Sequence, residues 1–346
     1  MNIFNLSKVD LEKYFSNINE KKFKAVQVYD WLYKKRITSF DEMTNIKKDV
    51  ITALKKDFVI KFPTILKKQT GKDVYKYLFE LEDKSKVEAV LMIHDYGNSL
   101  CVSTEVGCNM GCIFCESGRK LKKRNLEASE MVSQILLIEK DLGLRISHIV
   151  LMGIGEPFDN YDNVIKFIKI INDDRGIAIG ARHITVSTCG IVPKIYDFMN
   201  ENLQVNLAIS LHAPNNMIRN KIMKINKVYK IEDIIKAVND YIKKTNRRVT
   251  FEYIMLKDIN DSPQNARELA KLLKGINAYV NLIPYNETSH INLKKTSEKQ
   301  MMEFYDILKK NKINVTIRRE FGSGISAACG QLRTQYEEEN WWNIHI

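Results

Sequence analysis

A regular alternation of two kinds of segment, beginning near residue 98, constrains the fold of this chain more than any other feature. Short apolar runs rich in β-branched residues alternate with amphipathic stretches of roughly 10–17 residues. The strand-like runs are 99–104, 148–152, 183–187, 204–210, 248–255, 279–283 and 314–318, and the helix-like stretches are 129–142, 161–173, 194–202, 231–244, 262–273 and 297–310. This alternation predicts an α/β fold built on a parallel sheet.

Polar and glycine-containing motifs follow these strand-like runs directly. They are Gly107-Cys108, Gly153-Ile154-Gly155-Glu156-Pro157, Ser187, Ser210-Leu211-His212 and Asn286. In parallel barrels, reactive groups gather at the carboxyl ends of the strands. Residues that only fill the core would have no reason to lie at these positions alone, so we expect one functional site at that end of the sheet.

The composition is that of a globular protein. Hydrophobic residues make up 45% of the chain and charged residues 28%, which excludes a disordered chain or a collagen-like fibre. No apolar run reaches the roughly 18–20 residues that a membrane-spanning helix needs. The N-terminal residues lack a basic region followed by an apolar one, so we expect no secretory signal and a cytoplasmic location.

The N-terminal residues 1–92 are expected to form a small, basic and mainly helical unit. Its helices are predicted at 11–18, 25–35 and 47–58, with strands at 74–80 and 87–93. The whole chain has 54 Lys and Arg against 42 Asp and Glu, a net charge of +12. This excess favours a polyanionic partner such as nucleic acid, although the lysine-rich composition of an AT-rich genome would also produce it.

Three of the six cysteines form a C-x3-C-x2-C motif, at Cys108, Cys112 and Cys115. A zinc site usually has four ligands, and no fourth Cys or His lies nearby in the sequence. Three thiolates on one loop can instead hold three irons of a cubane cluster and leave the fourth iron open. A zinc site completed from elsewhere in the chain, or three buried cysteines without a metal, are the alternatives.

The C-x3-C-x2-C spacing is that of the radical S-adenosylmethionine (SAM) superfamily, and Gly153 to Pro157 resembles its SAM-binding G-G-E motif. Later motifs make the resemblance more specific. From about Lys21 to Arg333 the chain resembles the RlmN/Cfr family of radical SAM RNA adenine methyltransferases. The shared motifs are 27–33, 40–44, 101–108, 152–157, 207–214, 281–286 and Ala327-Ala328-Cys329-Gly330-Gln331-Leu332.

This resemblance implies a three-part architecture and two cofactors. The parts are an accessory RNA-binding domain at 1–92, a partial (β/α)6 TIM-like radical SAM barrel at 93–320, and a C-terminal segment at 321–346 that carries a cysteine loop. The cofactors are a [4Fe-4S] cluster, ligated by Cys108, Cys112 and Cys115, and SAM. The residues matched to SAM contacts are Gly155, Glu156, Ser187, Ser210, Leu211, His212 and Asn286.

The resemblance also assigns three catalytic residues. Cys329 matches a cysteine that one SAM methylates and whose methyl carbon, after hydrogen abstraction by a radical from a second SAM, adds to an adenine ring carbon. Cys101 matches the cysteine that releases the product by attacking the sulfur of Cys329, with a transient disulfide. Glu88 matches the general base. Without the resemblance, Cys101 reads as a buried small residue, Glu88 as a surface carboxylate, and Cys189 as structural.

The expected activity is therefore methylation of adenine C2 in 23S rRNA and in some tRNAs. An electron donor such as flavodoxin or ferredoxin and a monomeric state are also expected. The basic run 119–124, which follows the cysteine loop, is a candidate for phosphate contacts. The rival functions are a Cfr-like adenine C8 methyltransferase that confers antibiotic resistance, and a non-catalytic metal-containing RNA-binding protein.

Two segments depart from the family pattern. Residues 322–326 are glycine- and serine-rich where the family usually has acidic residues, and the tail 336–342 is unlike the family core. The tail receives no functional interpretation from the sequence.

Overall fold

The protein is built around one ten-stranded sheet. Its structure is a computed structural model that describes residues 1–288, 290–318 and 331–339. The strands are hydrogen-bonded in the order β1-β2-β3-β4-β7-β8-β9-β10-β11-β12. Their bounds are β1 Thr64–Gly71, β2 Val74–Glu80, β3 Lys86–His94, β4 Gly97–Cys101, β7 His148–Leu151, β8 Ile184–Thr188, β9 Asn206–Ser210, β10 Val249–Met255, β11 Ala278–Pro284 and β12 Asn314–Ile317. A separate short hairpin pairs β5 (Glu105–Val106) with β6 (Arg124–Asn125).

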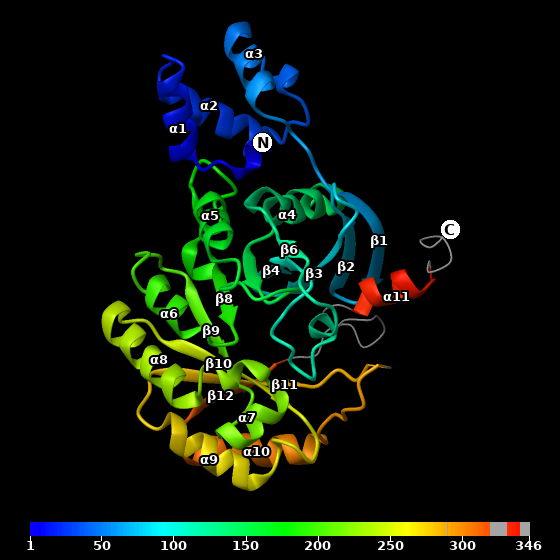
Figure 1. Ribbon diagram of the computed structural model, residues 1–346, viewed down its shortest axis with the longest axis vertical. Helices are drawn as coiled ribbons and strands as arrows, with labels where there is room; N and C mark the ends of the chain where they lie inside the picture. The colour runs from blue at the N-terminus through cyan, green and yellow to red at the C-terminus, as the bar shows by residue number, and fades with distance from the viewer. Residues whose placement is uncertain (289, 319–330, 340–346) are drawn as a thin grey trace.

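The strands from β4 through β7 to β12 all pair in parallel. Helices connect each strand to the next, so the chain returns to the same end of the sheet every time (Figure 1). These helices are α4 Ala128–Leu142, α5 Tyr161–Asn172, α6 Val192–Phe198, α7 Asn216–Ile222, α8 Ile231–Thr245, α9 Pro263–Leu273 and α10 Glu298–Lys310. The predicted α/β fold with a partial (β/α)6 barrel is confirmed.

Local sequence explains why these elements form where they do. On α8, the buried residues Ile231, Ile234, Ala237, Val238 and Tyr241 recur every three or four positions and therefore share one helix face. The other helices repeat this pattern, and serine caps begin α9 and α10 by accepting a backbone hydrogen bond. Short strands such as β7 are largely buried, as expected for strands covered on both faces.

Strands β1 to β3 extend the same sheet in antiparallel fashion, because β3 pairs with both β2 and β4. The division expected at residue 92 falls inside β3, so the hydrogen bonding groups β1 to β3 with the barrel strands. Alternating apolar residues predict that such strands exist. They do not say which sheet the strands join, because that depends on a partner distant in the sequence.

A helical unit precedes β1 and lies against the barrel helices (Figure 1). It contains α1 (Lys8–Asn17), α2 (Phe23–Tyr29), a π-helical turn at Asp30–Lys35 and α3 (Lys48–Asp57), close to the predicted helices. Three contacts dock it on α4, α5 and their flanks: Asn5 Nδ2 donates to Glu127 at 2.6 Å, Lys8 pairs with Asp173 at 3.0 Å, and Arg36 pairs with the buried Glu139.

Some short elements were not predicted, namely the β5–β6 hairpin, α7 and the C-terminal helix α11 (Gln331–Glu339). Each is short, and an isolated helix or hairpin of this length is marginal in water, so tertiary contacts rather than propensity determine them. In the described part of the chain, no helix has the length and apolar character needed to cross a membrane.

A buried arginine on α7 joins the ends of two strands. Arg219 is 0% exposed, and its guanidinium donates to the carbonyls of Cys189 at 2.6 Å and Ser210 at 3.2 Å. It also donates to the Leu211 carbonyl at 3.1 Å and to the Asn226 side chain at 3.0 Å. Because Arg219 bonds to the carbonyls of Cys189 and Ser210 at once, it holds the carboxyl ends of β8 and β9 at a fixed spacing.

Arg219→Leu is expected to lower the free energy of unfolding by about 3 kcal/mol, because several buried carbonyls would lose their donor at ~1–3 kcal/mol each. Urea denaturation of the apoprotein measures this loss. Arg182→Leu, at an exposed position in the turn before β8, is the control and should cost about 0.5 kcal/mol or less. Equal losses in the two variants would show that the strand-end bonds contribute nothing.

Candidate active site

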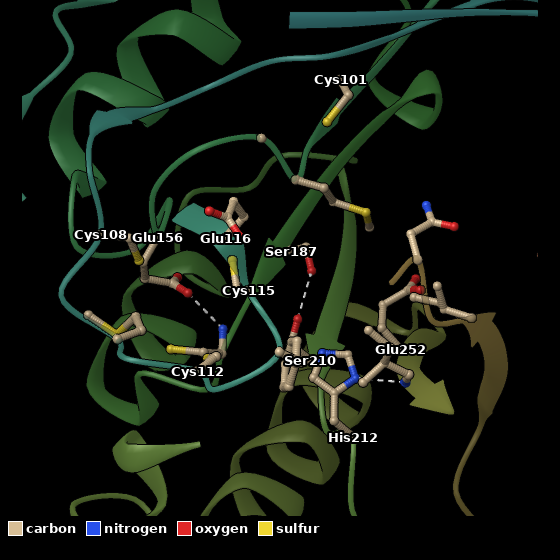
Figure 2. A pocket seen from close by; sticks show the side chains of 18 of the residues that line it. Cys101, Cys108, Cys112, Cys115, Glu116, Glu156, Ser187, Ser210, His212 and Glu252 are labelled. Carbon is tan, nitrogen blue, oxygen red and sulfur yellow. Dashed lines mark hydrogen bonds between the residues drawn. The ribbon is translucent and has the colours of Figure 1, made fainter. Parts of the chain in front are cut away.

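The carboxyl ends of the parallel strands surround one cavity of about 330 Å³ (Figure 2). A volume of this size falls in the range of small-molecule sites. The predicted residues that line it are Cys101, Cys108, Cys112, Cys115, Gly155, Glu156, Ser187, Ser210, His212 and Asn286. The structure therefore brings together residues that are spread over more than half of the sequence.

The three motif cysteines lie on a loop directly after β5. The loop folds back on itself, since the Cys108 amide donates to the Lys120 carbonyl at 3.0 Å. Gly107 has a φ of +85°, and a Cβ there would lie 2.3 Å from the Leu121 carbonyl oxygen, so only glycine permits this approach. A bond from the Ile113 amide to the Ile222 carbonyl, at 3.1 Å, ties the loop to α7.

The donor set suits an iron–sulfur cluster better than a single metal ion. The sulfur atoms of the three cysteines all face the cavity (Figure 2). Across residues 1–288, 290–318 and 331–339, no three His, Cys, Asp or Glu side chains are grouped to hold one ion. In a cubane each thiolate binds a different iron, so its ligands lie further apart than those of one zinc ion. The geometry therefore favours the cluster over zinc.

The thiols also need a cationic partner. Burial raises the pKa of Cys108 to about 12, and burial together with the neighbouring Cys115 raises that of Cys112 well above its ordinary value. A thiolate is the form that binds metal. The loop therefore presents ligands that ionise only when positive charge, such as iron, lies against them.

Gly155 and Glu156 lie where the G-G-E resemblance expects them, at the turn after β7. Gly155 has a φ of +111°, and a Cβ there would come within 2.6 Å of the Glu105 side chain. The Glu156 carboxylate is buried and accepts from the amides of Cys189 at 2.7 Å and Phe158 at 3.0 Å. Burial raises the pKa of Glu156, an effect that these two bonds oppose. The two bonds thus hold the carboxylate in a fixed orientation at the wall of the cavity.

Ser187, Ser210 and His212 mark the ends of β8 and β9. The two serine hydroxyls lie 3.4 Å apart. His212 adopts a φ of +57°, and its Nδ1 accepts from the Ile254 amide at 3.0 Å. Burial and the nearby Arg219 lower its pKa to about 3, so the ring is neutral and carries its proton on Nε2. His212 therefore offers the cavity a fixed hydrogen-bond donor.

Two predicted SAM contacts differ from the rest. The side chain of Leu211 lies in the hydrophobic core, and its amide donates to the Glu252 carbonyl at 3.1 Å. Asn286 lines the cavity from an exposed position after β11. Leu211 consequently shapes the site through its backbone, whereas Asn286 is free to turn toward a ligand.

Glu252 is a cavity residue that sequence reasoning missed. It faces the cavity from β10 (Figure 2) and is 5% exposed. Its carboxylate accepts from the Asn281 side chain at 2.9 Å. Burial raises its pKa, and Arg318 across the cavity opposes that shift. The available signal was a single charged residue inside the apolar run Thr250-Phe251-Glu252-Tyr253-Ile254.

The predicted release cysteine and the predicted base lie on neighbouring strands. Cys101 ends β4, lines the main cavity and pairs in register with Val90. Glu88, two residues before Val90 on β3, borders a narrow space that Cys101 also lines. Its carboxylate is almost wholly buried, and Lys76 Nζ lies 3.1 Å from Oε2. The alternative that Glu88 is a solvated surface carboxylate is therefore excluded, since its charge is compensated inside the protein.

Cys329 lies outside the described residues, as do residues 322–326. Among the described residues no disulfide joins any two of the other five cysteines, which are Cys101, Cys108, Cys112, Cys115 and Cys189. Within that part of the chain the structure therefore gives no support to a disulfide. The Cys189 amide donates to Glu156, and the buried Cys189 side chain lines the cavity.

The comparisons with known proteins agree with this geometry. The sequence model of the radical SAM superfamily matches residues 102–273, and that of the ribosomal RNA large subunit methyltransferase N-terminal domain matches residues 1–60. A crystal structure of a radical SAM methyltransferase from Sphaerobacter thermophilus superposes with a TM-score of 0.90 at 37% identity, covering 96% of this chain and 98% of that one.

Two relatives are similar over nearly their whole length. The protein of Enterococcus faecalis is 53% identical over 342 residues, 96% of either chain. That of Acholeplasma laidlawii is 52% identical over 336 residues, 97% of this chain and 99% of its own. Both carry the name "Probable dual-specificity RNA methyltransferase RlmN". At this identity and coverage, the chain belongs to the RlmN family of radical SAM RNA methyltransferases.

Proposed function

We propose that the protein methylates carbon C2 of an adenosine in 23S rRNA, and of adenosines in some tRNAs. The convergence of the three loop cysteines, the Glu156 carboxylate and Cys101 on one cavity carries this proposal. Two comparisons support RNA as the substrate. Residues 1–60 match the N-terminal domain of ribosomal RNA large subunit methyltransferases, and the relatives are named dual-specificity RNA methyltransferases.

The chemistry of the target explains why such a cavity is needed. C2 of adenine is an electron-poor ring carbon, so it cannot attack a methyl sulfonium as a nucleophile does. The [4Fe-4S] cluster, when bound, supplies the electron that cleaves SAM to a carbon radical. Cys108, Cys112 and Cys115 hold it, while Glu156, His212 and the two serines orient SAM.

Three further residues handle the methyl group and the proton. Cys329 carries the methyl from a first SAM as a thioether, and the methylene radical derived from it joins to C2. The resulting ring radical would lose one electron, which would return to the cluster, and the C2 proton, which Glu88 would accept. Cys101 then attacks the sulfur of Cys329, so that the S–S bond forms as the S–C bond breaks. The released carbon takes up a proton to become the methyl group, and a transient disulfide between the two cysteines remains for the reductant to open. The side-by-side strands of Glu88 and Cys101 suit successive action on one base.

RNA recognition is assigned to the helical unit and to part of the basic run 119–124. Within that run, Lys122 pairs with Glu105 and Asp159, and Arg124 pairs with Asp83 and Glu130, so these two hold the fold together. Arg119, Lys120 and Lys123 are exposed, although Arg119 pairs with Glu116 and Lys120 with Glu337. We further propose a monomer that acts in the cytoplasm with a flavodoxin or ferredoxin as electron donor.

The product is expected to be 2-methyladenosine. The reaction contains anaerobically reconstituted protein, SAM, a reductant and unmodified 23S rRNA, and nucleosides are separated before mass spectrometry. A product that elutes as 8-methyladenosine would place this chain with the C8 methyltransferases. A loaded protein that cleaves SAM yet methylates neither 23S rRNA nor tRNA would contradict the proposal.

The two catalytic cysteines should fail in different ways. Cys329→Ala removes the methyl carrier, so it should abolish methylation and leave RNA binding unchanged. Cys101→Ala removes the release step, so the protein–RNA bond should persist and resist denaturing electrophoresis. Labelled RNA detects both outcomes, with Cys189→Ala as the cysteine control. Wild-type turnover by Cys329→Ala would rule out the carrier mechanism.

The cluster ligands are expected to control iron content independently of RNA. Wild-type protein should hold about four irons per chain after reconstitution, and Cys112→Ala should lose most of the iron and the visible absorbance. Cys189→Ala, which alters a buried cysteine beside the loop, should keep both. Full iron in Cys112→Ala would show that another residue completes the site.

A further inference from the structure

The C-terminal helix α11 is the segment that the proposed function leaves without a part. It packs against β2 and β3, beside the outer strands of the sheet (Figure 1). Its first turn is buried through Leu332, Arg333 and Thr334. Its second half is acidic and includes Glu337 and Glu339. The helix thus has one end inserted beside the active site and one end on the surface.

The inserted end of α11 covers the predicted base. The Arg333 amide donates to Glu88 Oε1, while Lys76 approaches the other carboxylate oxygen. Thr334 lies 3.4 Å from the carboxylate of Glu116, which directly follows the cluster ligand Cys115. In this arrangement both oxygens of Glu88 already have partners from the protein. A proton acceptor for an RNA base needs one of them released.

The Arg333 side chain is part of this inserted end. It is 3% exposed, and among the described residues its Nε and Nη2 find no hydrogen-bond partner. Within this part of the chain, hydrogen bonds of the Arg333 amide and the Thr334 hydroxyl hold the inserted turn.

The surface end of α11 lies on lysines. Glu337 pairs with Lys120, Glu339 Oε2 lies 2.7 Å from Lys67 Nζ, and Lys86 Nζ lies 5.9 Å from the centre of the Tyr336 ring. We name Lys67, Lys86 and Lys120 the basic strip. These lysines come from β1, β3 and the cysteine loop, and α11 brings them together on one surface.

We propose that the basic strip is a surface for RNA phosphates, and that α11 occupies it until RNA displaces the helix; this rests on the proposed function. The carboxylates of α11 take the places that phosphates would take. Exposed ion pairs are weak and easily screened, whereas RNA gains from releasing counterions at several contacts at once. Displacement would also free an oxygen of Glu88 and release the helix that begins two residues after Cys329.

Hydrogen exchange of the full chain tests the displacement directly. Unmodified 23S rRNA is the probe, and the amides of 332–337, including that of Arg333, should exchange faster once RNA is bound. The same samples receive SAM and reductant, so methylation is read in parallel. Product formation with α11 equally protected would overturn this inference alone. Absence of both RNA binding and product would overturn it together with the proposed function.

Charge variants test the competition. Glu337→Gln with Glu339→Gln should tighten RNA binding about 3- to 10-fold and raise α11 exchange without RNA. Glu303→Gln with Asp306→Asn, at exposed positions of α10, removes the same charge elsewhere and should change RNA affinity less. Equal tightening in both pairs would show a net-charge effect and contradict the proposal.

Lysine variants separate phosphate binding from merely holding the helix. Lys67→Gln with Lys120→Gln should weaken RNA binding at least several-fold, because each lysine contributes a phosphate contact. The control is Lys271→Gln with Lys274→Gln. Lys271 lies on helix α9, and Lys274 caps its carboxyl end. If the lysines served only to hold α11, their replacement would leave RNA affinity unchanged or tighten it, which would overturn the assignment of the strip.

Discussion

Parallel hydrogen bonding from β4 to β12 is the constraint on which the rest of the structure depends. A parallel strand must be followed by a crossover before the next can begin, so every strand delivers its carboxyl end to the same edge. That edge receives the cysteine loop after β5, the Glu156 turn after β7 and the polar ends of β8 and β9. The functional side chains are gathered by topology, not by proximity in the sequence.

Bringing the strand ends together does not by itself fix the positions of the side chains. Buried polar hydrogen bonds fix those positions. Arg219 spans the ends of β8 and β9, and Glu156 is held by amides from two turns. His212 is locked as a donor because β10 occupies its other ring nitrogen. Each of these groups costs free energy to bury and regains it only with its partners in place. The cavity is therefore pre-organised for a ligand of defined shape.

The sequence predicted the fold and much of the candidate site because both leave periodic or clustered signals. The strand at 148–152 is found as β7 His148–Leu151, and the helix at 231–244 as α8 Ile231–Thr245. Apart from Leu211, the predicted cluster and SAM residues line one cavity. Glu252 and Arg219 were missed because neither belongs to a repeating pattern in the sequence. Glu252 is a single charged residue in an apolar strand, and Arg219 lies on a helix of seven residues. Cys329 lies outside the described residues, so its place remains a prediction.

By itself, the sequence determined the alternation of strands and helices, the cysteine spacing and the family motifs, because these depend on neighbours within a few residues. Only the tertiary structure decided that β1 to β3 continue the barrel sheet, that Glu88 is buried against Lys76, and that α11 lies on the basic strip. Those outcomes join residues that are distant in sequence, as Glu88 and Arg333 are. Their energies arise from burial and charge pairing that exist only once the sheet has formed.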